Sequence, residues 1–452
     1  MIALKLKIAC LFIGMLPVCG SLCAQNQWVN LFNGKDLTGW KQVNGKAPYT
    51  VENGELVGTS VANTPNSFLI TEKTYGDFIL ELQFKIAPGI NSGIQFRSEQ
   101  RPEDGRVNGY QMEVDHSPRL WSGAIYDESR RGWLYGLDVN PKAQTAYRPG
   151  EWNTYRIECI GNHIRTWVNT VPTVDLFDEM TPRGFIGLQV HSLYKVEDVG
   201  KQARWRNIRI QTENLKPAPA QGIYVINLLP NQLSESERAD GWSLLWDGKT
   251  TQGWRSVFGT AFPENGWKIE DNALKVIPTD GSETGNDIVT TQQFGPAFDF
   301  RFEFLFTEGT NSGVKYFVDE QYKPGGKSGI GLEYQILDDA RHPDAKQGVV
   351  GNRTMGSLYD LIPSLKFEWA AARIGKWNQG RIVAYPDGRV EHYLNNLKIV
   401  EYQRGTPIYK ALVARSKYGQ WDGFGMAKTG PILLQDHGNA VAFRSLRFKE
   451  LK

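Results

Sequence analysis

Apolar and polar residues alternate in short runs along most of the chain. The runs FILELQFKI at 78–86 and FDFRFEFLF at 298–306 show the pattern most clearly, and it is typical of a strand with one buried face. Gly, Asn and Pro separate the runs. Only LSESERADGW predicts a short helix, with Ser234 as its N-cap and Glu237 as the capping-box partner. Many short strands without a βαβ rhythm predict antiparallel jelly-roll sandwiches.

The same sequence blocks occur twice and in the same order. LFNGKDLTGW at 31–40 returns as LWDGKTTQGW at 245–254, and GFIGLQVHS at 184–192 returns as GPILLQDHG at 430–438. Self-similarity of this kind indicates a tandem duplication. We therefore predict an all-β fold of two tandem β-sandwiches.

Domain boundaries follow from the duplication. The first sandwich is predicted at 27–213 and the second at 231–452. Between them, residues 214–230 are rich in Pro and Gly, which is typical of a linker.

The N-terminal residues predict an export signal. Two lysines precede a short apolar run, and a plausible cleavage site lies near Ala24. Such a segment is too short to span a membrane, so residues 1–24 are predicted to be a signal peptide. The protein is then expected in the periplasm, at the cell surface or outside the cell, and not as an integral membrane protein. A faint lipobox ending at Cys19 leaves a lipid anchor open.

The charge balance excludes one class of partner. The chain has 51 basic and 49 acidic residues, a net charge of +2, and no long run of one sign. A nucleic-acid partner is therefore not expected.

A row of polar residues in GYQMEVDHS, at 109–117, is a candidate site. In a strand, Gln111, Glu113 and Asp115 share one face. Glu-Val-Asp resembles the start of the Glu-x-Asp-x-x-Glu strand of laminarinase-type glucanases, but the third carboxylate is missing. A glucanase needs two properly spaced carboxylates, so that activity is not expected.

The second copy carries the same acid and amide in swapped order. Glu333 and Gln335 share a face in GLEYQILDD, and Asp338 follows at the strand end. A carboxylate and an amide in both copies predict a concave polar face of the sheet that binds sugar hydroxyls. The alternative is the solvated face of an ordinary sheet.

A histidine recurs at one position of the repeat. His191 and His437 each follow a glutamine, Gln189 or Gln435, by two residues, so each pair shares a strand face. Either each histidine completes a buried polar network, or it is an acid–base group or metal ligand beside the carboxylate row.

Cations and tyrosines also recur near the row. Arg97 and Lys315 follow the two Asn-Ser-Gly turns at strand spacing and could orient a substrate or form plain salt bridges. Tyr126 and Tyr359 each precede an aspartate and could hold a sugar hydroxyl or close a loop. The candidate platforms for a sugar ring are Trp121, Trp133 and Trp421.

These blocks together resemble a known family. LFNGKDLTGW, NSGI, GEWNTYRI, WVN, GLQVHS and RNIRI resemble the 3-keto-disaccharide hydrolase domain, formerly a domain of unknown function, and the second copy is similar to its secreted Bacteroidetes form. The resemblance implies concanavalin A-like jelly rolls and a secreted enzyme that cleaves 3-keto-disaccharides or other 3-keto-glycosides. It also implies a partner sugar 3-dehydrogenase that makes the ketone.

The resemblance further implies roles for the candidate residues. A ketone at C3 makes the proton on C2 more acidic. A site that uses this acidity needs a base, a group that stabilises the enolate and a proton donor. The predicted catalytic residues are Glu333, His437 and Lys315, with Glu113, His191 and Arg97 in the first copy. The predicted sugar-binding residues are Gln335, Asp338, Gln435, Tyr359, Lys417, Gln111, Asp115, Gln189 and Tyr126. A divalent metal could replace the cation. The alternative reading is a non-catalytic carbohydrate-binding protein.

Overall fold

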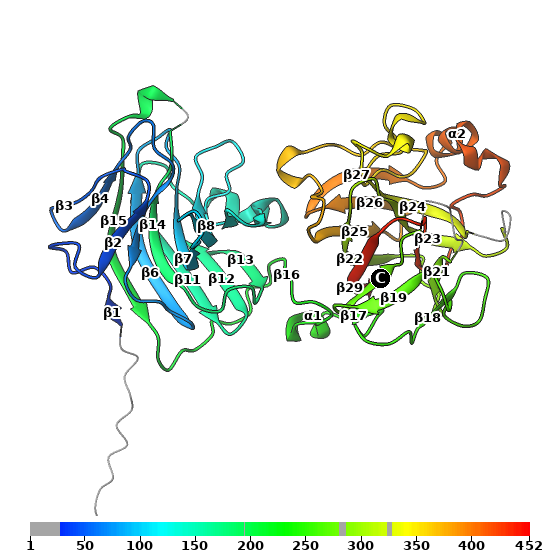
Figure 1. Cartoon of the computed structure of the whole chain (residues 1–452), viewed down its shortest axis with the longest axis horizontal. Coiled ribbons are helices and arrows are strands. Elements are labelled where there is room, and N and C mark those ends of the chain that lie inside the picture. Colours follow the sequence, from blue (N-terminus) through cyan, green and yellow to red (C-terminus); the bar gives the residue numbers. More distant parts are fainter. Residues whose placement is uncertain (1–27, 194, 280–285, 323–327) are drawn as a thin grey trace, which may run out of the picture.

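Two β-sandwiches lie side by side in the computed structural model, which describes residues 28–193, 195–279, 286–322 and 328–452 (Figure 1). The predicted signal peptide at 1–24 lies outside the described residues. The prediction of an all-β chain with two tandem jelly-roll sandwiches is confirmed, whereas the domain boundaries stay predictions.

The first sandwich has two sheets, and their strands are antiparallel except for the β13–β16 pair. One contains β1 (Val29–Asn30), β3 (Tyr49–Glu52), β4 (Glu55–Thr59), β6 (Phe78–Ile86), β11 (Asn153–Ile160), β12 (His163–Val168), β13 (Val171–Phe177), β15 (Gln202–Gln211) and β16 (Ile226–Asn227). The other contains β2 (Trp40–Asn44), β5 (Ser67–Thr71), β7 (Ser92–Gln100), β8 (Val107–Val114), β9 (Ile125–Glu128), β10 (Gly132–Tyr135) and β14 (Phe185–Val190). This second sheet has the order β10-β9-β8-β7-β14-β5-β2, so the predicted polar row in β8 lies near its centre.

The second sandwich repeats this arrangement. Its larger sheet contains β17 (Ser243–Leu244), β19 (Trp267–Glu270), β20 (Ala273–Val276), β22 (Phe298–Phe306), β25 (Asn378–Ala384), β26 (Arg389–Leu394), β27 (Leu397–Gln403) and β29 (Val441–Glu450). Its smaller sheet contains β18 (Trp254–Ser256), β21 (Ile288–Thr290), β23 (Asn311–Asp319), β24 (Ile330–Leu337) and β28 (Leu433–Leu434). The order β18-β21-β28-β23-β24 places β23 and β24, with the candidate Lys315 and Glu333, side by side at one edge.

Among the residues that the structure describes, the helices are few and short. They are α1 (Glu235–Ala239), α2 (Pro407–Arg415) and the 3-10 turns η1 (Leu137–Val139), η2 (Pro141–Thr145), η3 (Val196–Asp198), η5 (Pro343–Lys346), η6 (Glu368–Ala370) and η7 (Lys417–Gln420). The predicted capping box of α1 is present, because Glu237 N donates to Ser234 Oγ at 3.1 Å and Ser234 N donates to Glu237 Oε2 at 2.8 Å. The helix α2 was not predicted from the sequence.

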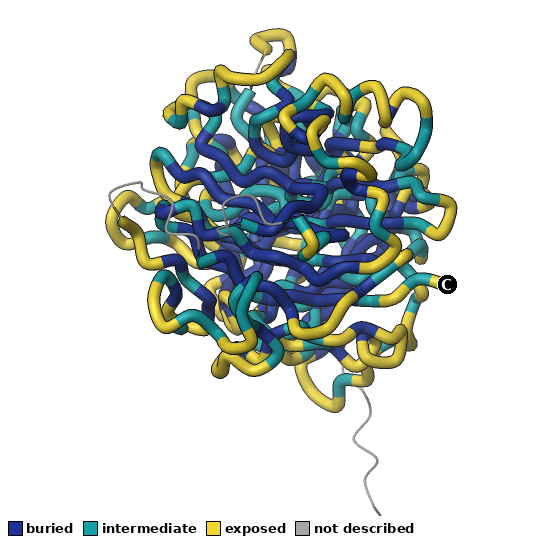
Figure 2. The backbone as a smooth tube through the Cα atoms, turned by 90° about the vertical axis from the view of Figure 1, so that its right-hand side faces the viewer, coloured by how far each residue is buried: buried dark blue, intermediate teal, exposed yellow. Residues whose placement is uncertain are grey.

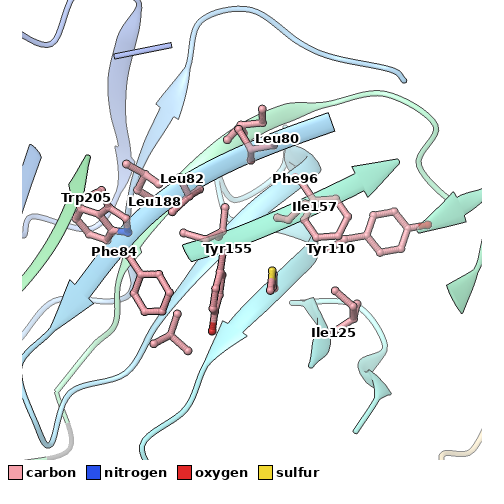
Figure 3. Close-up of a cluster of buried hydrophobic side chains, with 14 of the residues drawn as sticks. Leu80, Leu82, Phe84, Phe96, Tyr110, Ile125, Tyr155, Ile157, Leu188 and Trp205 are labelled. Atoms are coloured by element: carbon pink, nitrogen blue, oxygen red, sulfur yellow. The ribbon is translucent and has the colours of Figure 1, made fainter. Parts of the chain in front are cut away.

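Each sandwich has its own apolar core between its two sheets. In the first, alternate residues of β6 such as Leu80, Leu82 and Phe84 point inward against Tyr155 and Trp205 (Figure 3). Burial of this apolar surface is the main force that holds the sheets together. Figure 2 shows buried backbone through the centre and exposed loops around the rim.

The alternation is imperfect in β22, where two acidic residues on the outer face are also buried. Asp299 is paired with Arg381 at 2.7 Å, and Glu303 with Arg444 at 2.8 Å. The long arginine side chains cover the carboxylates and supply their hydrogen-bond partners, so burial of these charges is tolerated.

The segment predicted as a linker is held against both sandwiches. Its β16 pairs in parallel with β13, and Ala218 N donates to the Glu158 carboxylate at 3.2 Å. From the other side, Arg447 Nη2 donates to Leu229 O at 2.7 Å. The segment is therefore an ordered strap and not a free tether.

The two sandwiches also touch directly. The guanidinium of Arg373 donates to Arg131 O across the boundary. A cavity of about 230 Å³ lies beside this contact, between Trp133 of the first sandwich and Trp369 of the second. Within residues 28–193, 195–279, 286–322 and 328–452, no helix has the length and apolar character needed to cross a membrane.

Candidate active site

A pocket of about 290 Å³ opens over the smaller sheet of the second sandwich. It brings together the predicted residues Lys315, Glu333, Gln335, Tyr359, Lys417, Gln435 and His437, and is completed by Asn311, Ser328, Gly329, Ile330, Gly331, Tyr418 and Trp421. Residues from separate strands and loops therefore converge as expected for a site.

Glu333 projects from β24 and lies directly opposite Lys315 of β23. Its side chain is almost fully buried, at 4% exposure. The hydroxyl of Tyr418 lies 3.5 Å from Glu333 Oε2, and the Gln335 amide nitrogen, in its favoured orientation, donates to Oε1 at 3.2 Å. Gly313 makes room for this carboxyl, because a Cβ there would lie 2.3 Å from Glu333 Oε1.

Lys315 is held by a chain of hydrogen-bonded polar groups. Its Nζ donates to Ser328 Oγ at 2.9 Å and to Gly329 O at 3.2 Å. Ser328 Oγ in turn donates to Asp287 Oδ2 at 2.6 Å. Burial raises the pKa of Asp287, and the positive charge of Lys315 is the largest opposing influence. Asp287 and Ser328 were missed in the sequence because they lie in connections that carry no repeated motif.

The segment from α2 to η7 forms one wall of the pocket. The ammonium of Lys417 lies 4.3 Å from the centre of the Tyr359 ring, and desolvation lowers the pKa of Lys417 although the nearby Glu333 opposes this. Trp421, one of the candidate platforms, also lines the pocket. Tyr418 was missed, although it lies in the same short stretch of sequence as Lys417 and Trp421.

Gln435 and His437 follow β28 and also line the pocket. The His437 Nε2 lies 3.5 Å from Asn311 Nδ2, and its ring centre is 6.5 Å from that of His342. Gln435 Oε1 is buried without a hydrogen-bond partner in the part of the chain that the structure describes. A buried, unpaired acceptor calls for a ligand donor or an ordered water.

Asp338 does not line this pocket, contrary to its predicted role in sugar binding. Its carboxylate accepts hydrogen bonds from Gly309 N at 2.8 Å and Ala340 N at 3.2 Å and pairs with Arg341 at 3.3 Å. It therefore holds the turn that follows β24.

The first sandwich carries the corresponding row in β8, with amide side chains where the second sandwich has Lys315 and Glu333. Gln111 lies opposite Gln95, at the position of the Glu333–Lys315 pair. Glu113 accepts from Asn91 at 2.5 Å and from Gln111 at 2.9 Å. Desolvation raises the pKa of Glu113 to about 7.

Gln189 and His191 lie at the corresponding end of β14. Both polar atoms of the Gln189 side chain are buried without partners among the described residues. His191 is partly buried, and its Nδ1 donates to Ser192 O at 2.7 Å. Desolvation lowers the pKa of His191.

Arg97 does not reach the row, so its predicted catalytic position was wrong. Its guanidinium pairs with Asp77 at 2.9 Å and donates to Gly76 O and Gly161 O, each at 2.8 Å. The register shifts between Phe96 and Glu99, and this bulge turns Arg97 away from the face that carries Gln95.

Asp115 and Tyr126 flank the row. The Asp115 carboxylate accepts from Ser117 N at 2.8 Å and pairs with Arg119 at 3.2 Å, so it caps the turn after β8 and does not extend the row. Tyr126 lies opposite Gln111, and its ring centre is 5.0 Å from that of Trp133.

No metal-binding cluster stands out. Over the described ranges, no three His, Cys, Asp or Glu side chains are grouped so that they could hold a metal ion. The residues that the structure describes therefore do not fit a protein-held metal centre.

The chain is similar to several known proteins. A 3-keto-disaccharide hydrolase of Bacteroides thetaiotaomicron is 34% identical over 236 residues, covering 47% of this chain and 79% of the relative. A crystal structure of a putative glycosyl hydrolase from Parabacteroides distasonis aligns at 29% identity with a TM-score of 0.43, over 50% of this chain and all of that one. A second such structure from the same organism aligns at 22% identity with a TM-score of 0.32, over 44% of this chain and 99% of that one.

The family match covers both sandwiches. Residues 27–211 and 241–449 each match the family described as 3-keto-alpha-glucoside-1,2-lyase-like domain. Because these two matches span most of the chain, the protein belongs to the 3-keto-alpha-glucoside-1,2-lyase-like domain family.

Proposed function

We propose that the pocket of the second sandwich cleaves 3-keto-glycosides by elimination across C1 and C2, followed by hydration. One observation carries the proposal: a carboxylate, an ammonium and an imidazole, from Glu333, Lys315 and His437, line one pocket. These are the three kinds of group that the reaction needs. Family membership and the relative's activity support the same reaction.

Proton transfer begins at C2. The ketone at C3 acidifies the C2–H bond, and a base, Glu333 or His437, takes the proton while the electron pair moves onto the C3 oxygen. The Lys315 ammonium stabilises the developing enolate oxygen, since one of its three N–H donors is left free by the bonds to Ser328 and Gly329.

Cleavage follows from the enolate. Its electron pair returns to form the C1–C2 double bond and expels the glycosidic oxygen, which takes a proton from the other acid–base group. Water then adds back across this double bond and gives the free 3-keto sugar. Gln435 and Lys417 are expected to bind the sugar, because both line the pocket and the Gln435 side-chain oxygen has no partner among the described residues.

The supply and location of the substrate are part of the proposal. A 3-keto-glycoside must come from an oxidation at C3, so a sugar 3-dehydrogenase is the expected upstream partner. The lysines and apolar run of residues 1–24 support export to the periplasm or cell surface.

The first experiment is to incubate the full chain with 3-keto-trehalose and with 3-keto-β-glucosides in deuterated water. Release of 3-keto-glucose with deuterium at C2 is expected, because elimination and rehydration exchange that position whereas direct hydrolysis does not. A parallel reaction with EDTA is expected to run at the same rate. Glu333→Gln and His437→Ala are each expected to lower kcat by about 100-fold or more.

Two results would count against the proposal. Product without deuterium at C2 would replace elimination with direct hydrolysis. No product, with the sugar still bound, would make the pocket a carbohydrate-binding site without catalytic activity.

A further inference from the structure

We propose that Asp287 and Ser328 position the Lys315 ammonium for the reaction, and that the reaction is confined to the second sandwich, where this pair is present. This inference rests on the proposed function. It assigns roles to Asp287 and Ser328 and predicts one catalytic site for each chain, although both sandwiches belong to the same family.

The first support is the geometry of the hydrogen bonds that link Lys315 through Ser328 to Asp287. Lys315 and Asp287 are exposed by only 5% and 1%, and Ser328 lies between them, accepting from one and donating to the other. Asp287 is itself fixed, since its Oδ1 accepts from Asp436 N at 2.9 Å. A long, flexible lysine side chain is thereby restricted to one place, and such preorganisation strengthens the stabilisation of a developing charge.

The second support is the corresponding position in the first sandwich. Gln95 occupies the register position of Lys315, and its amide is used within the protein: Nε2 donates to Gln111 at 2.7 Å and Oε1 accepts from Ser98 at 2.7 Å. No cation stands at this point to stabilise an enolate.

The first sandwich also has no charge at the position that corresponds to Asp287. Gln189 of β14 pairs with Phe68 of β5. In the second sandwich Leu434 pairs with Ile288, which places Asp287 opposite Gln435. Phe68 therefore stands where Asp287 would, and it packs in a small apolar cluster with Ile70, Val107 and Phe185.

The third support is the wall of the pocket. In the second sandwich, residues 404–432 join β27 to β28 and carry Lys417, Tyr418 and Trp421. In the first, residues 178–184 alone join β13 to β14. This short connection has no counterpart of that wall. The Lys315 cation, the residues that position it and the wall are therefore all confined to the second sandwich.

The test uses kinetics of full-chain variants on a 3-keto-glycoside that the wild type cleaves. Ser328→Ala and Asp287→Asn are each expected to lower kcat by up to about 100-fold with little change in KM. Ser328→Thr, which keeps the hydroxyl, is expected to recover most of the rate. Ser98→Ala is the matched control, because Ser98 holds Gln95 as Ser328 holds Lys315, and it is expected to leave the rate unchanged.

A double-mutant cycle separates positioning from general damage. In the Lys315→Met background, Ser328→Ala is expected to cause no further loss, because its effect acts through Lys315. A further loss there, or a failure of Ser328→Thr to recover activity while Tm is unchanged, would overturn the positioning role.

The number of catalytic sites is tested with Glu333→Gln. We expect no residual turnover beyond about 1%, whereas residual activity near half of the wild type would reveal a second working site and overturn the confinement. A wild-type chain that cleaves no 3-keto-glycoside would instead overturn the proposed function itself, and this inference with it.

Discussion

Glu113 and His392 are buried titratable side chains outside the pocket of the second sandwich. Glu113 is in β8 of the first sandwich, and desolvation raises its pKa to about 7. His392 is in β26, and desolvation lowers its pKa to about 4. In both cases burial disfavours the charged form, and each residue links the stability of the fold to pH with its own sign.

Glu113→Gln is expected to stabilise the protein at pH 8 but not at pH 4. The folded carboxyl holds its proton up to about pH 7, whereas in the unfolded chain it loses it near 4.5. Stability is therefore lost as pH rises through this window, by about 3 kcal/mol. Denaturant unfolding of wild type and variant at both pH values measures the difference; an equal difference at the two pH values would contradict this account.

His392 is expected to act in the opposite direction. Its Nδ1 donates to Gly356 O at 3.1 Å, and its Nε2 accepts from the Tyr316 hydroxyl at 2.7 Å, so the neutral ring is satisfied. The unfolded ring titrates near 6.5 and the folded ring near 4. Stability contributed by this residue is full above about 6.5 and falls by about 3 kcal/mol as pH drops to 4.

The measurement compares wild type with His392→Gln by denaturant unfolding between pH 4 and pH 7.5. The variant is less stable at pH 7.5, and the gap is expected to narrow toward pH 4. A constant gap would mean that His392 does not titrate in this range.

Single residues differed in how far the sequence could predict them. Lys315, Glu333 and His437 were predicted to act together because the repeat and strand spacing place polar groups on one face, and they do meet in one pocket. Arg97 was misplaced because a bulge breaks the strand spacing after Phe96. Asp287 and Ser328 depend on contacts between distant segments, which no local pattern reveals.

At the scale of elements, the alternating runs predicted strands well, since each needs one buried face. The helix α2 escaped prediction because it has only nine residues, too few for its periodicity to be distinctive. Its start nevertheless follows a known rule, as Thr406 accepts from Tyr409 N at 3.2 Å and Pro407 comes next.

Gly313→Ala is expected to damage the site through its strand. A Cβ at Gly313 would lie 2.3 Å from Glu333 Oε1 and would push the carboxyl aside. We expect kcat to fall by up to about 100-fold while Tm changes little. Gly93→Ala is the matched control in the first sandwich, where a Cβ would lie 2.3 Å from Gln111 Cδ, and turnover is expected to be unchanged. Equal losses in both variants would show that the first sandwich also contributes to turnover.

At the scale of the whole molecule, the duplication predicted two sandwiches because the same sequence blocks recur in the same order. The behaviour of 214–230 was harder to predict. Pro and Gly suggest a free linker, but β16 pairs with β13 and Arg447 reaches Leu229 from the second sandwich. Composition describes the local preferences of a segment, whereas its docking depends on partners elsewhere in the chain.

Arg447→Met is expected to loosen this strap. The Arg447 guanidinium is buried and also donates to Gln232 O at 3.0 Å. Gln232 O keeps a hydrogen bond from Asn227, but the buried Leu229 carbonyl loses the donor that Arg447 supplies, at a cost of about 1–3 kcal/mol. Limited proteolysis should then cut faster between 214 and 232 than in the wild type, and Tm should fall. Unchanged cleavage in this segment would mean that β16 alone holds the strap.

The wall formed by residues 404–432 has a consequence for how related chains diversify. The acid and the ammonium sit on strands of a sheet whose hydrogen bonds constrain them, whereas Lys417, Tyr418 and Trp421 sit on one connection between strands. Loops tolerate insertion and exchange far better than the strands they join. Variation in this one connection would therefore change the shape of the pocket while the polar groups on the strands stay the same.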